Sequence, residues 1–230
     1  MYVGEHLGNE SCERVRSFTL SEAATTTFEH PNNLLLVAER PLPPRPYGIP
    51  DEAFALLDGR TKMITKAPLR LLTLQALELP RRRVFWDVGF CTGSVSIEAR
   101  LQFPHLTVVA FEIRPEGREL MDANTHRHGA PGIITHIGDF LQADLDSLPR
   151  PDAVFIGGHG GRLPQMMERI ATVLQPGGCI VLNSVSESSR EAFLSGSRAA
   201  GLTLCPSLHV ALNDYNPIDI LKACKPITNP

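Results

Sequence analysis

The sequence has few of the features that mark membrane, secreted or nucleic-acid-binding proteins. Its five cysteines are odd in number and include no C-x-x-C pair, which excludes a regular disulfide framework or a cysteine-rich zinc site. Only 6% of the residues are aromatic and the net charge is −3, so nothing favours a nucleic-acid partner. No apolar run reaches the roughly 18 residues of a membrane span, and no export signal opens the chain. We therefore expect neither a membrane nor a nucleic-acid partner, and a reducing, cytoplasmic location.

Composition and proline spacing predict how the chain is organised. The 230 residues are 43% hydrophobic and 20% charged, which is typical of a globular protein. Five prolines fall between Pro41 and Pro50, and proline at that density makes a stiff, extended connection. We therefore expect three parts: residues 1–40, a linker at 41–48, and a domain at 49–230. The first part is too short for a complete domain; we expect in it a helix within Ser17–Phe28 and one strand at Asn33–Ala38.

The larger domain shows strands and helices in regular alternation. We expect helices at Lys66–Leu77, Ser94–Gln102, Pro115–His126, Leu163–Leu174 and Ser188–Ala200. We expect strands at Val84–Val88, Thr107–Phe111, Ile133–Ile137, Ala153–Ile156, Cys179–Asn183, Leu202–Ala211 and Ile218–Cys224. The last two strands have no room for a crossover helix between them, so they must be antiparallel. The pattern predicts an α/β, Rossmann-like fold with a seven-stranded, mostly parallel sheet and an antiparallel last strand.

The segment from Asp87 to Gly93 follows the first strand of this sheet as a glycine turn. Gly89 and Gly93 would let the backbone approach a ligand closely, and Asp87 is placed to bind an ammonium group. The dinucleotide fingerprint G-x-G-x-x-G is absent, because Cys91 and Ser94 stand at two of its glycine positions. A plain structural turn between strand and helix is the alternative interpretation.

Two acids follow the next two strands and complete a nucleoside-binding pattern. Glu112 ends the second strand, where a carboxylate accepts hydrogen bonds from both ribose hydroxyls. Asp139 and Phe140 follow the third strand, where an acid contacts the adenine amino group and an apolar side chain packs on the ring. The acids can instead serve a helix N-terminus and an ordinary turn. Together with the antiparallel end of the sheet, the pattern favours S-adenosylmethionine and a class I methyltransferase.

Four glycines surround His159 after the fourth strand, at the edge where ligands bind in open α/β sheets. Their backbone can lie against a large flat ligand, and His159 can move a proton or stay in solvent. Lys62, Lys66 and Arg70 near the first helix form either a basic patch for an acidic substrate or a solvated helix face. Asn183 is expected at the same edge.

Several of these segments resemble the CbiT-type decarboxylating precorrin methyltransferases of cobalamin biosynthesis. The resemblance covers roughly Tyr47 to Lys225 and rests on YGIPDEAF, MITKAPLRLLTLQAL, WDVG-x-x-TGSVSIEA, IGDF, FIGGHGGRLPQMM and LQPGGCIVLNSV. The residues before the linker are similar to the end of the tetrapyrrole methylase (CbiE-type) domain that precedes this domain in fused CobL-type enzymes. We therefore expect residues 1–40 to be the remnant tail of such an upstream domain.

The resemblance implies methyl transfer to carbon 15 of a precorrin-6B-type tetrapyrrole, with decarboxylation of the ring C acetate. It implies that the cofactor is held by Asp87, Gly89, Cys91, Gly93, Glu112, Asp139 and Phe140. It implies that the macrocycle is faced by Thr65, Lys66, Gly158, His159, Gly160 and Asn183. His159 and Tyr215 are the candidate proton donors, and a homotetramer is the expected assembly.

One departure from the family pattern leaves rival interpretations open. The family turn has small residues, typically Ala-Gly, where this chain has Phe90-Cys91. A cysteine held there with positive φ would carry strain of order 1–3 kcal/mol. The rivals are another class I methyltransferase, for example one acting on tRNA, and a catalytically silent scaffold domain of a fusion protein.

Overall fold

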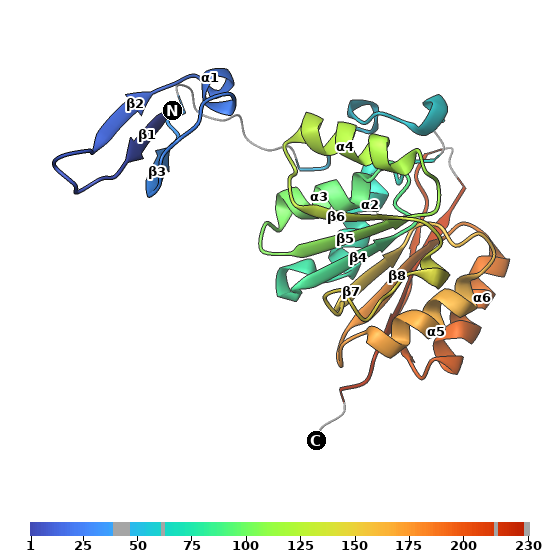
Figure 1. Ribbon diagram of the computed structural model, residues 1–230. Helices are drawn as coiled ribbons and strands as arrows, with labels where there is room; N and C mark the ends of the chain where they lie inside the picture. The colour runs from blue at the N-terminus through green and yellow to red at the C-terminus, as the bar shows by residue number, and fades with distance from the viewer. Residues whose placement is uncertain (39–46, 61–62, 214–215, 228–230) are drawn as a thin grey trace. The chain divides into compact units, whose positions relative to one another are not determined.

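The computed structural model describes residues 1–38, 47–60, 63–213 and 216–227. The chain divides into two units, Met1–Arg45 and Pro46–Pro230 (Figure 1). Most of the expected linker at 41–48 lies outside the described residues. In the described part of the chain, no helix combines the length and apolarity that crossing a membrane requires.

The N-terminal unit is a small antiparallel sheet with one short helix. Its strands β1 (Tyr2–Glu5), β2 (Arg14–Ser17) and β3 (Asn32–Leu35) are arranged in the order β2-β1-β3. Helix α1 (Leu20–Ala24) is capped by Thr19, which forms a capping box with Glu22. The sequence predicts α1 and β3 but not β1 or β2, because β3 begins a continuous apolar run whereas the short segments of β1 and β2 contain none.

The larger unit contains one twisted sheet with helices on both faces. Its parallel strands are β4 (Val84–Val88), β5 (Thr107–Glu112), β6 (Ile133–Ile137), β7 (Ala153–Ile156) and β8 (Cys179–Ser184). Strand β11 (Ile218–Cys224) is antiparallel to β8, and the order across the sheet is β10-β11-β8-β7-β4-β5-β6. This confirms the predicted α/β architecture with an antiparallel end.

The structure corrects the expected strand count, because the predicted strand at Leu202–Ala211 is broken. It forms β9 (Thr203–Leu204) and β10 (Leu208–Val210), each paired with β11, so the described residues make a sheet of eight strands rather than seven. Pro206 lies in the break, and a proline cannot donate a hydrogen bond to a neighbouring strand.

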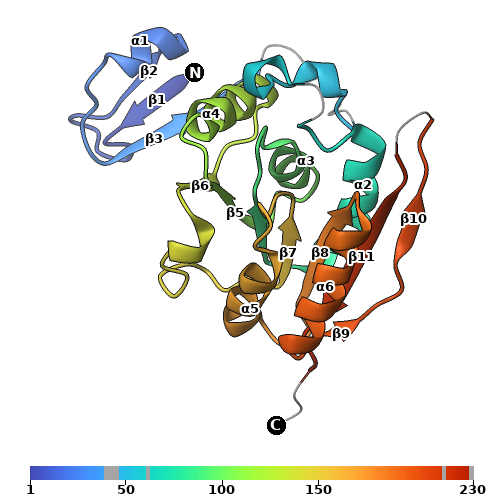
Figure 2. The same cartoon turned by 90° about the vertical axis from the view of Figure 1, so that its right-hand side faces the viewer.

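The helices divide between the two faces of the sheet. Figures 1 and 2 show α2 (Ala67–Ala76), α3 (Ser94–Gln102) and α4 (Gly117–His128) on one face. The other face carries α5 (Leu163–Val173) and α6 (Glu187–Ala199). The sequence predicts that this helix starts at Pro115, and α4 begins two residues later, at Gly117.

Buried side chains fill both interfaces between sheet and helices. Trp86, Phe111 and Phe193 belong to the cluster under α5 and α6, whereas Phe85 and Phe155 belong to the cluster under α2 and α3. Residues alternate between the two faces along β4, as the two-residue repeat of a strand requires. The carboxyl ends of the parallel strands form the edge at which open α/β sheets bind their ligands.

Candidate active site

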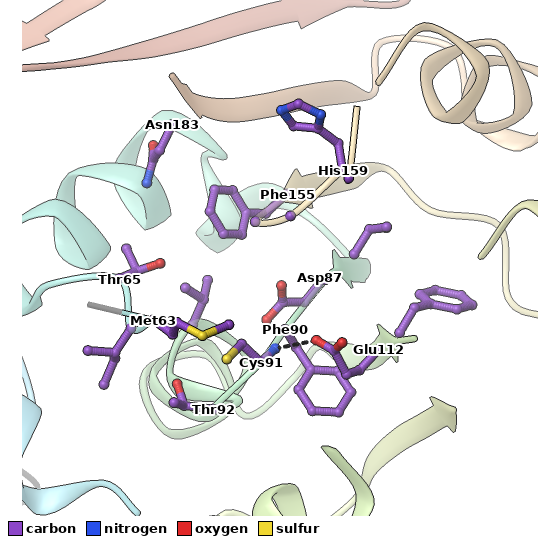
Figure 3. Close-up of a pocket in the computed structure, with 18 of the residues that line it drawn as sticks. Met63, Thr65, Asp87, Phe90, Cys91, Thr92, Glu112, Phe155, His159 and Asn183 are labelled. Atoms are coloured by element: carbon purple, nitrogen blue, oxygen red, sulfur yellow. Dashed lines mark hydrogen bonds between the residues drawn. The ribbon is translucent and has the colours of Figure 1, made fainter. Parts of the chain in front are cut away.

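A cavity of about 780 Å³ lies along the carboxyl ends of β4, β5, β7 and β8. Its volume is within the range of small-molecule sites. Eleven predicted site residues line it: Thr65, Lys66, Asp87, Gly89, Cys91, Glu112, Phe140, Gly158, His159, Gly160 and Asn183. Figure 3 shows several of them converging from different strands and loops. Gly93 and Asp139 do not line the cavity, and Tyr215 lies outside the described residues.

The carboxylate of Asp87 is buried at the end of β4 with only one oxygen satisfied by the described chain. Oδ2 accepts hydrogen bonds from the backbone N–H and the hydroxyl of Ser96, at 3.1 and 2.6 Å. Oδ1 is buried and has no hydrogen-bond partner among the residues described. Burial raises the pKa of Asp87 to about 7, against the opposing effect of Ser96. An orphaned buried oxygen beside a cavity fits a cationic ligand group such as an ammonium.

Glu112 joins the end of β5 to the turn after β4. Its Oε2 accepts from the backbone N–H of Cys91 at 2.9 Å. Its Oε1 accepts from the backbone and the guanidinium of Arg114, at 3.1 and 3.0 Å. The side chain is 2% exposed, and each oxygen retains lone-pair capacity. The fixed carboxylate can therefore accept further hydrogen bonds from a pair of ligand hydroxyls.

Cys91 has a φ of +51°, in the left-handed region that non-glycine residues rarely adopt. The backbone at this position therefore has the conformation that makes a cysteine strained. Its thiol lies at the cavity wall, where burial is the main cause of a raised pKa. A raised pKa keeps the sulfur protonated and poorly nucleophilic.

Gly89 and Gly93 were predicted to let the backbone approach a ligand, but the structure shows other reasons for glycine at these positions. Gly89 has a φ of +79°, and a Cβ there would lie 2.7 Å from the backbone nitrogen and oxygen of Gly158. Gly93 has a φ of +73°, and its Cβ would lie 2.6 Å from the sulfur of Met121. The fixed backbone of Gly158 therefore requires glycine at position 89, independently of any ligand. At Gly93 the neighbour is the end of a flexible side chain, and the positive φ is what favours glycine.

The Gly138-Asp139-Phe140 segment presents its ring, rather than its acid, to the cavity. Phe140 is buried and packs edge-to-face on Phe111, with ring centroids 5.0 Å apart. Asp139 forms an ion pair of 2.7 Å with Arg162, which lowers the pKa of the Asp139 carboxyl. Arg162 lines the cavity. The acid therefore acts through an ion pair with a cavity-lining arginine, a contact of which the sequence predicted only the acid.

His159 is held by hydrogen bonds on both ring nitrogens. The backbone N–H of Gly161 donates to Nδ1 at 3.2 Å, so the proton of the neutral ring sits on Nε2, which lies 3.3 Å from the hydroxyl oxygen of Ser189. Burial lowers the pKa of His159, which favours this neutral form. The imidazole therefore links the glycine loop to the first turn of α6.

A buried arginine fixes the segment that contains Thr65 and Lys66, which lines the cavity. The fully buried guanidinium of Arg70 donates to the Thr65 carbonyl at 2.8 Å and to the Ile49 carbonyl, and it pairs with Glu98 and Asp51. Lys66 lies 3.5 Å from Asp51. The predicted basic patch is therefore wrong for Arg70, which is structural, while Lys62 lies outside the described residues.

The described residues contain no cluster of three or more His, Cys, Asp or Glu side chains arranged to hold a metal ion. Sequence reasoning missed Ser96, Arg114 and Arg162 as parts of the site. Ser96 lies inside the TGSVSIEA motif and Arg162 directly after the glycine loop, so position in a motif is the signal that each one offers.

Comparison with known proteins agrees with the geometry. The family model of the precorrin methyltransferase domain matches residues 56–229. The chain is 35% identical over 168 residues to the cobalt-precorrin-6B C(15)-methyltransferase (decarboxylating) of Salmonella typhimurium, covering 73% of this chain and 85% of that protein. It is 33% identical to the precorrin-6Y C(5,15)-methyltransferase [decarboxylating] of a Sinorhizobium species, covering 76% of this chain but 41% of that protein.

A solved structure shows the same fold. The precorrin-6y C5,15-methyltransferase of Geobacter metallireducens superposes with a TM-score of 0.69 at 32% identity, over 77% of this chain and 97% of that one. These matches confirm the class I methyltransferase fold and the resemblance drawn from the sequence motifs. The chain belongs to the precorrin methyltransferase domain family.

Proposed function

We propose that this protein transfers a methyl group from S-adenosylmethionine to carbon 15 of a precorrin-6B-type tetrapyrrole and decarboxylates the ring C acetate, within cobalamin biosynthesis. The observation that carries the proposal is the cavity at the carboxyl edge, lined by eleven of the predicted site residues. The names of the Salmonella and Sinorhizobium relatives support the reaction.

The residues present fit the proposed cofactor. The orphaned Oδ1 of Asp87 is a buried anionic acceptor for the ammonium group, and Glu112 can accept both ribose hydroxyls. Phe140 offers a ring face or edge to the adenine, beside the Asp139–Arg162 pair. When bound, S-adenosylmethionine supplies an activated methyl group on its sulfonium.

The protein's own contribution to methyl transfer is alignment and exclusion of water. On the substrate side, Lys66 offers a positive charge for a carboxylate, and the glycine loop offers an open, flat backbone surface. Thr65 lies beside Lys66, its carbonyl fixed by Arg70. This wall suits a large, flat, carboxylate-rich ring better than a small substrate.

Decarboxylation needs a proton at the carbon that loses carbon dioxide. The C–C bond breaks, the conjugated ring takes up the electron pair, and a proton completes the new methyl group. His159, which can give up a proton as the imidazolium, and Tyr215 are the proposed donors. If His159→Ala retained both wild-type methylation and wild-type carbon dioxide release, that role for His159 would be excluded.

The test is a reaction with purified protein, S-adenosylmethionine and a precorrin-6B-type substrate, with and without cobalt. Mass spectrometry should show the gain of one methyl group and the loss of one carbon dioxide. Carbon-13 labelling of the donor methyl should place the new group on carbon 15. A protein that binds S-adenosylhomocysteine but leaves this substrate unchanged would contradict the proposed reaction.

We also propose that residues 1–40 derive from a tetrapyrrole methylase (CbiE-type) domain. The similarity of this segment and the greater length of the Sinorhizobium relative support this. In that case carbon 5 is methylated by the other domain, and this chain modifies carbon 15 alone. A carbon 5 methyl group in the product of this chain would contradict the assignment.

The proposed assembly is a cytoplasmic homotetramer, which rests on the resemblance to the family. Light scattering coupled to size-exclusion chromatography measures the mass of the assembly directly. A monomer at micromolar concentration would contradict the tetramer, and recovery of the native protein in a membrane or exported fraction would contradict the location.

A further inference from the structure

The side chain of Asn183 reaches the cavity from the end of β8, on the side away from the proposed cofactor. In the sheet, β7 lies between β8 and β4, and β5 lies beyond β4. Asp87 and Glu112 end β4 and β5, so Asn183 belongs to the opposite, substrate-facing part of the same cavity. Figure 3 shows it well separated from both acids.

A single buried hydroxyl fixes the orientation of this carboxamide. Thr73, in the middle of α2 and fully buried, is 110 residues away in the sequence. Nδ2 of Asn183 donates to its Oγ1 at 2.9 Å, and that hydroxyl lies 2.7 Å from the Leu69 carbonyl and 3.1 Å from Oδ1 of Asn183. Because a hydroxyl has one proton, the shorter contact indicates a chain from Asn183 to Thr73 to Leu69.

This chain determines what the carboxamide presents to a ligand. It uses one amide N–H of Asn183 and leaves the second N–H and the carbonyl lone pairs for other partners. Without the Thr73 hydroxyl, the amide could rotate and exchange its donor for its acceptor. The oxygen and nitrogen of an amide are similar in size, so packing alone selects weakly between the two orientations.

We propose that Thr73 is a positioning residue, whose hydroxyl sets the Asn183 carboxamide so that its free N–H donates to a carboxylate of the substrate. The inference rests on the proposed function for the identity of that substrate. It assigns a role in substrate selection to a side chain that does not line the cavity itself.

The first test compares three variants with matched controls. Thr73→Val keeps the shape and removes the hydroxyl, Thr73→Ser restores the hydroxyl, and Asn183→Ala removes the group that is positioned. Thr125→Val is the control, because Thr125 also bonds a helix carbonyl, that of Met121 at 2.8 Å, on α4 and away from the cavity.

Thr73→Val should lower kcat/KM for the tetrapyrrole about tenfold, which corresponds to one misplaced hydrogen bond. The Kd for S-adenosylhomocysteine should stay within about twofold, and Thr73→Ser should recover most of the activity. Thr73→Val combined with Asn183→Ala should be no worse than Asn183→Ala alone. Additive losses, or an equal loss of cofactor affinity, would overturn the inference.

A second measurement does not depend on turnover, so it separates this inference from the proposed function. The side-chain amide protons of Asn183 in the nuclear magnetic resonance spectrum report whether the group is held. In the wild type one of them should exchange slowly with solvent, and in Thr73→Val both should exchange at the rate of a free carboxamide. Unchanged exchange would overturn the positioning role whatever the substrate is.

Discussion

The backbone nitrogen of Cys91 donates to Oε2 of Glu112 at 2.9 Å, and this contact joins the turn after β4 to the end of β5. It places the residue that departs from the family pattern in direct contact with the acid proposed to hold the ribose. The left-handed backbone at Cys91 and the fixed carboxylate of Glu112 are therefore parts of one arrangement.

Replacing Cys91 by glycine should stabilise the protein. Glycine adopts a φ of +51° without the Cβ strain that cysteine carries, which is worth about 0.5–1 kcal/mol after its greater entropy in the unfolded chain is counted. Thermal or urea unfolding measures the change. Cys91→Ala is the control, because it removes the thiol but keeps the Cβ. If alanine stabilises as much as glycine, strain is not the cause.

Replacing Glu112 by glutamine should weaken cofactor binding while the fold persists. The amide retains one acceptor oxygen but presents N–H groups toward the donors of Cys91 or Arg114. We expect the Kd for S-adenosylhomocysteine, measured by calorimetry, to rise at least about tenfold. Glu119→Gln, on the surface of α4, is the matched control. Equal affinities for both variants would remove Glu112 from the cofactor site.

Replacing Gly89 by alanine should be far more damaging than the same change at Gly201. Both glycines have positive φ, +79° and +67°, but a Cβ at Gly201 meets nothing within 4 Å, whereas at Gly89 it would lie 2.7 Å from the backbone of Gly158. The φ cost is about 1 kcal/mol at each position, and the backbone clash adds about 1–3 kcal/mol at Gly89 alone. Similar unfolding midpoints for the two variants would contradict this.

Much of the fold follows from local patterns in the sequence. The predicted bounds of β4, β6, β7 and β11 match the structure because each is a short apolar run between turn residues. The break between β9 and β10 was missed, although Pro206 in the middle of the predicted strand signals it. The local pattern therefore predicts that a strand is present, whereas the single residue Pro206 decides whether that strand is continuous.

The sequence predicted which residues line the site but not which contacts their side chains make. The sequence placed eleven residues at one cavity because strand ends meet at one edge of a parallel sheet. It did not show that Arg162 binds Asp139 or that His159 is held by Ser189, since these contacts join residues 23 and 30 positions apart. It also placed Arg70 on the surface, because helical spacing does not reveal that the buried Glu98 and the partly buried Asp51 pair with it.

The pKa of Asp87 predicts that stability depends on pH. Burial raises this pKa from its usual 3.8 to about 7, so the folded state binds a proton that the unfolded state has lost. The stabilisation is complete below pH 3.8 and disappears as the pH rises through 7. Between pH 4 and 8 the free energy of unfolding of the wild type should fall by on the order of 2–4 kcal/mol relative to that of Asp87→Asn. Parallel urea titrations across this range check the sign.

The same carboxyl should couple cofactor binding to proton release. A ligand ammonium beside the orphaned Oδ1 favours the charged carboxylate, so the pKa of Asp87 falls on binding and a proton leaves near neutral pH. The affinity for S-adenosylhomocysteine should therefore rise between pH 6 and 8. Calorimetry at pH 6.5 in two buffers with different ionisation enthalpies measures the proton released. Asp87→Asn should show no release, and identical wild-type enthalpies in both buffers would mean that Asp87 does not receive the ammonium.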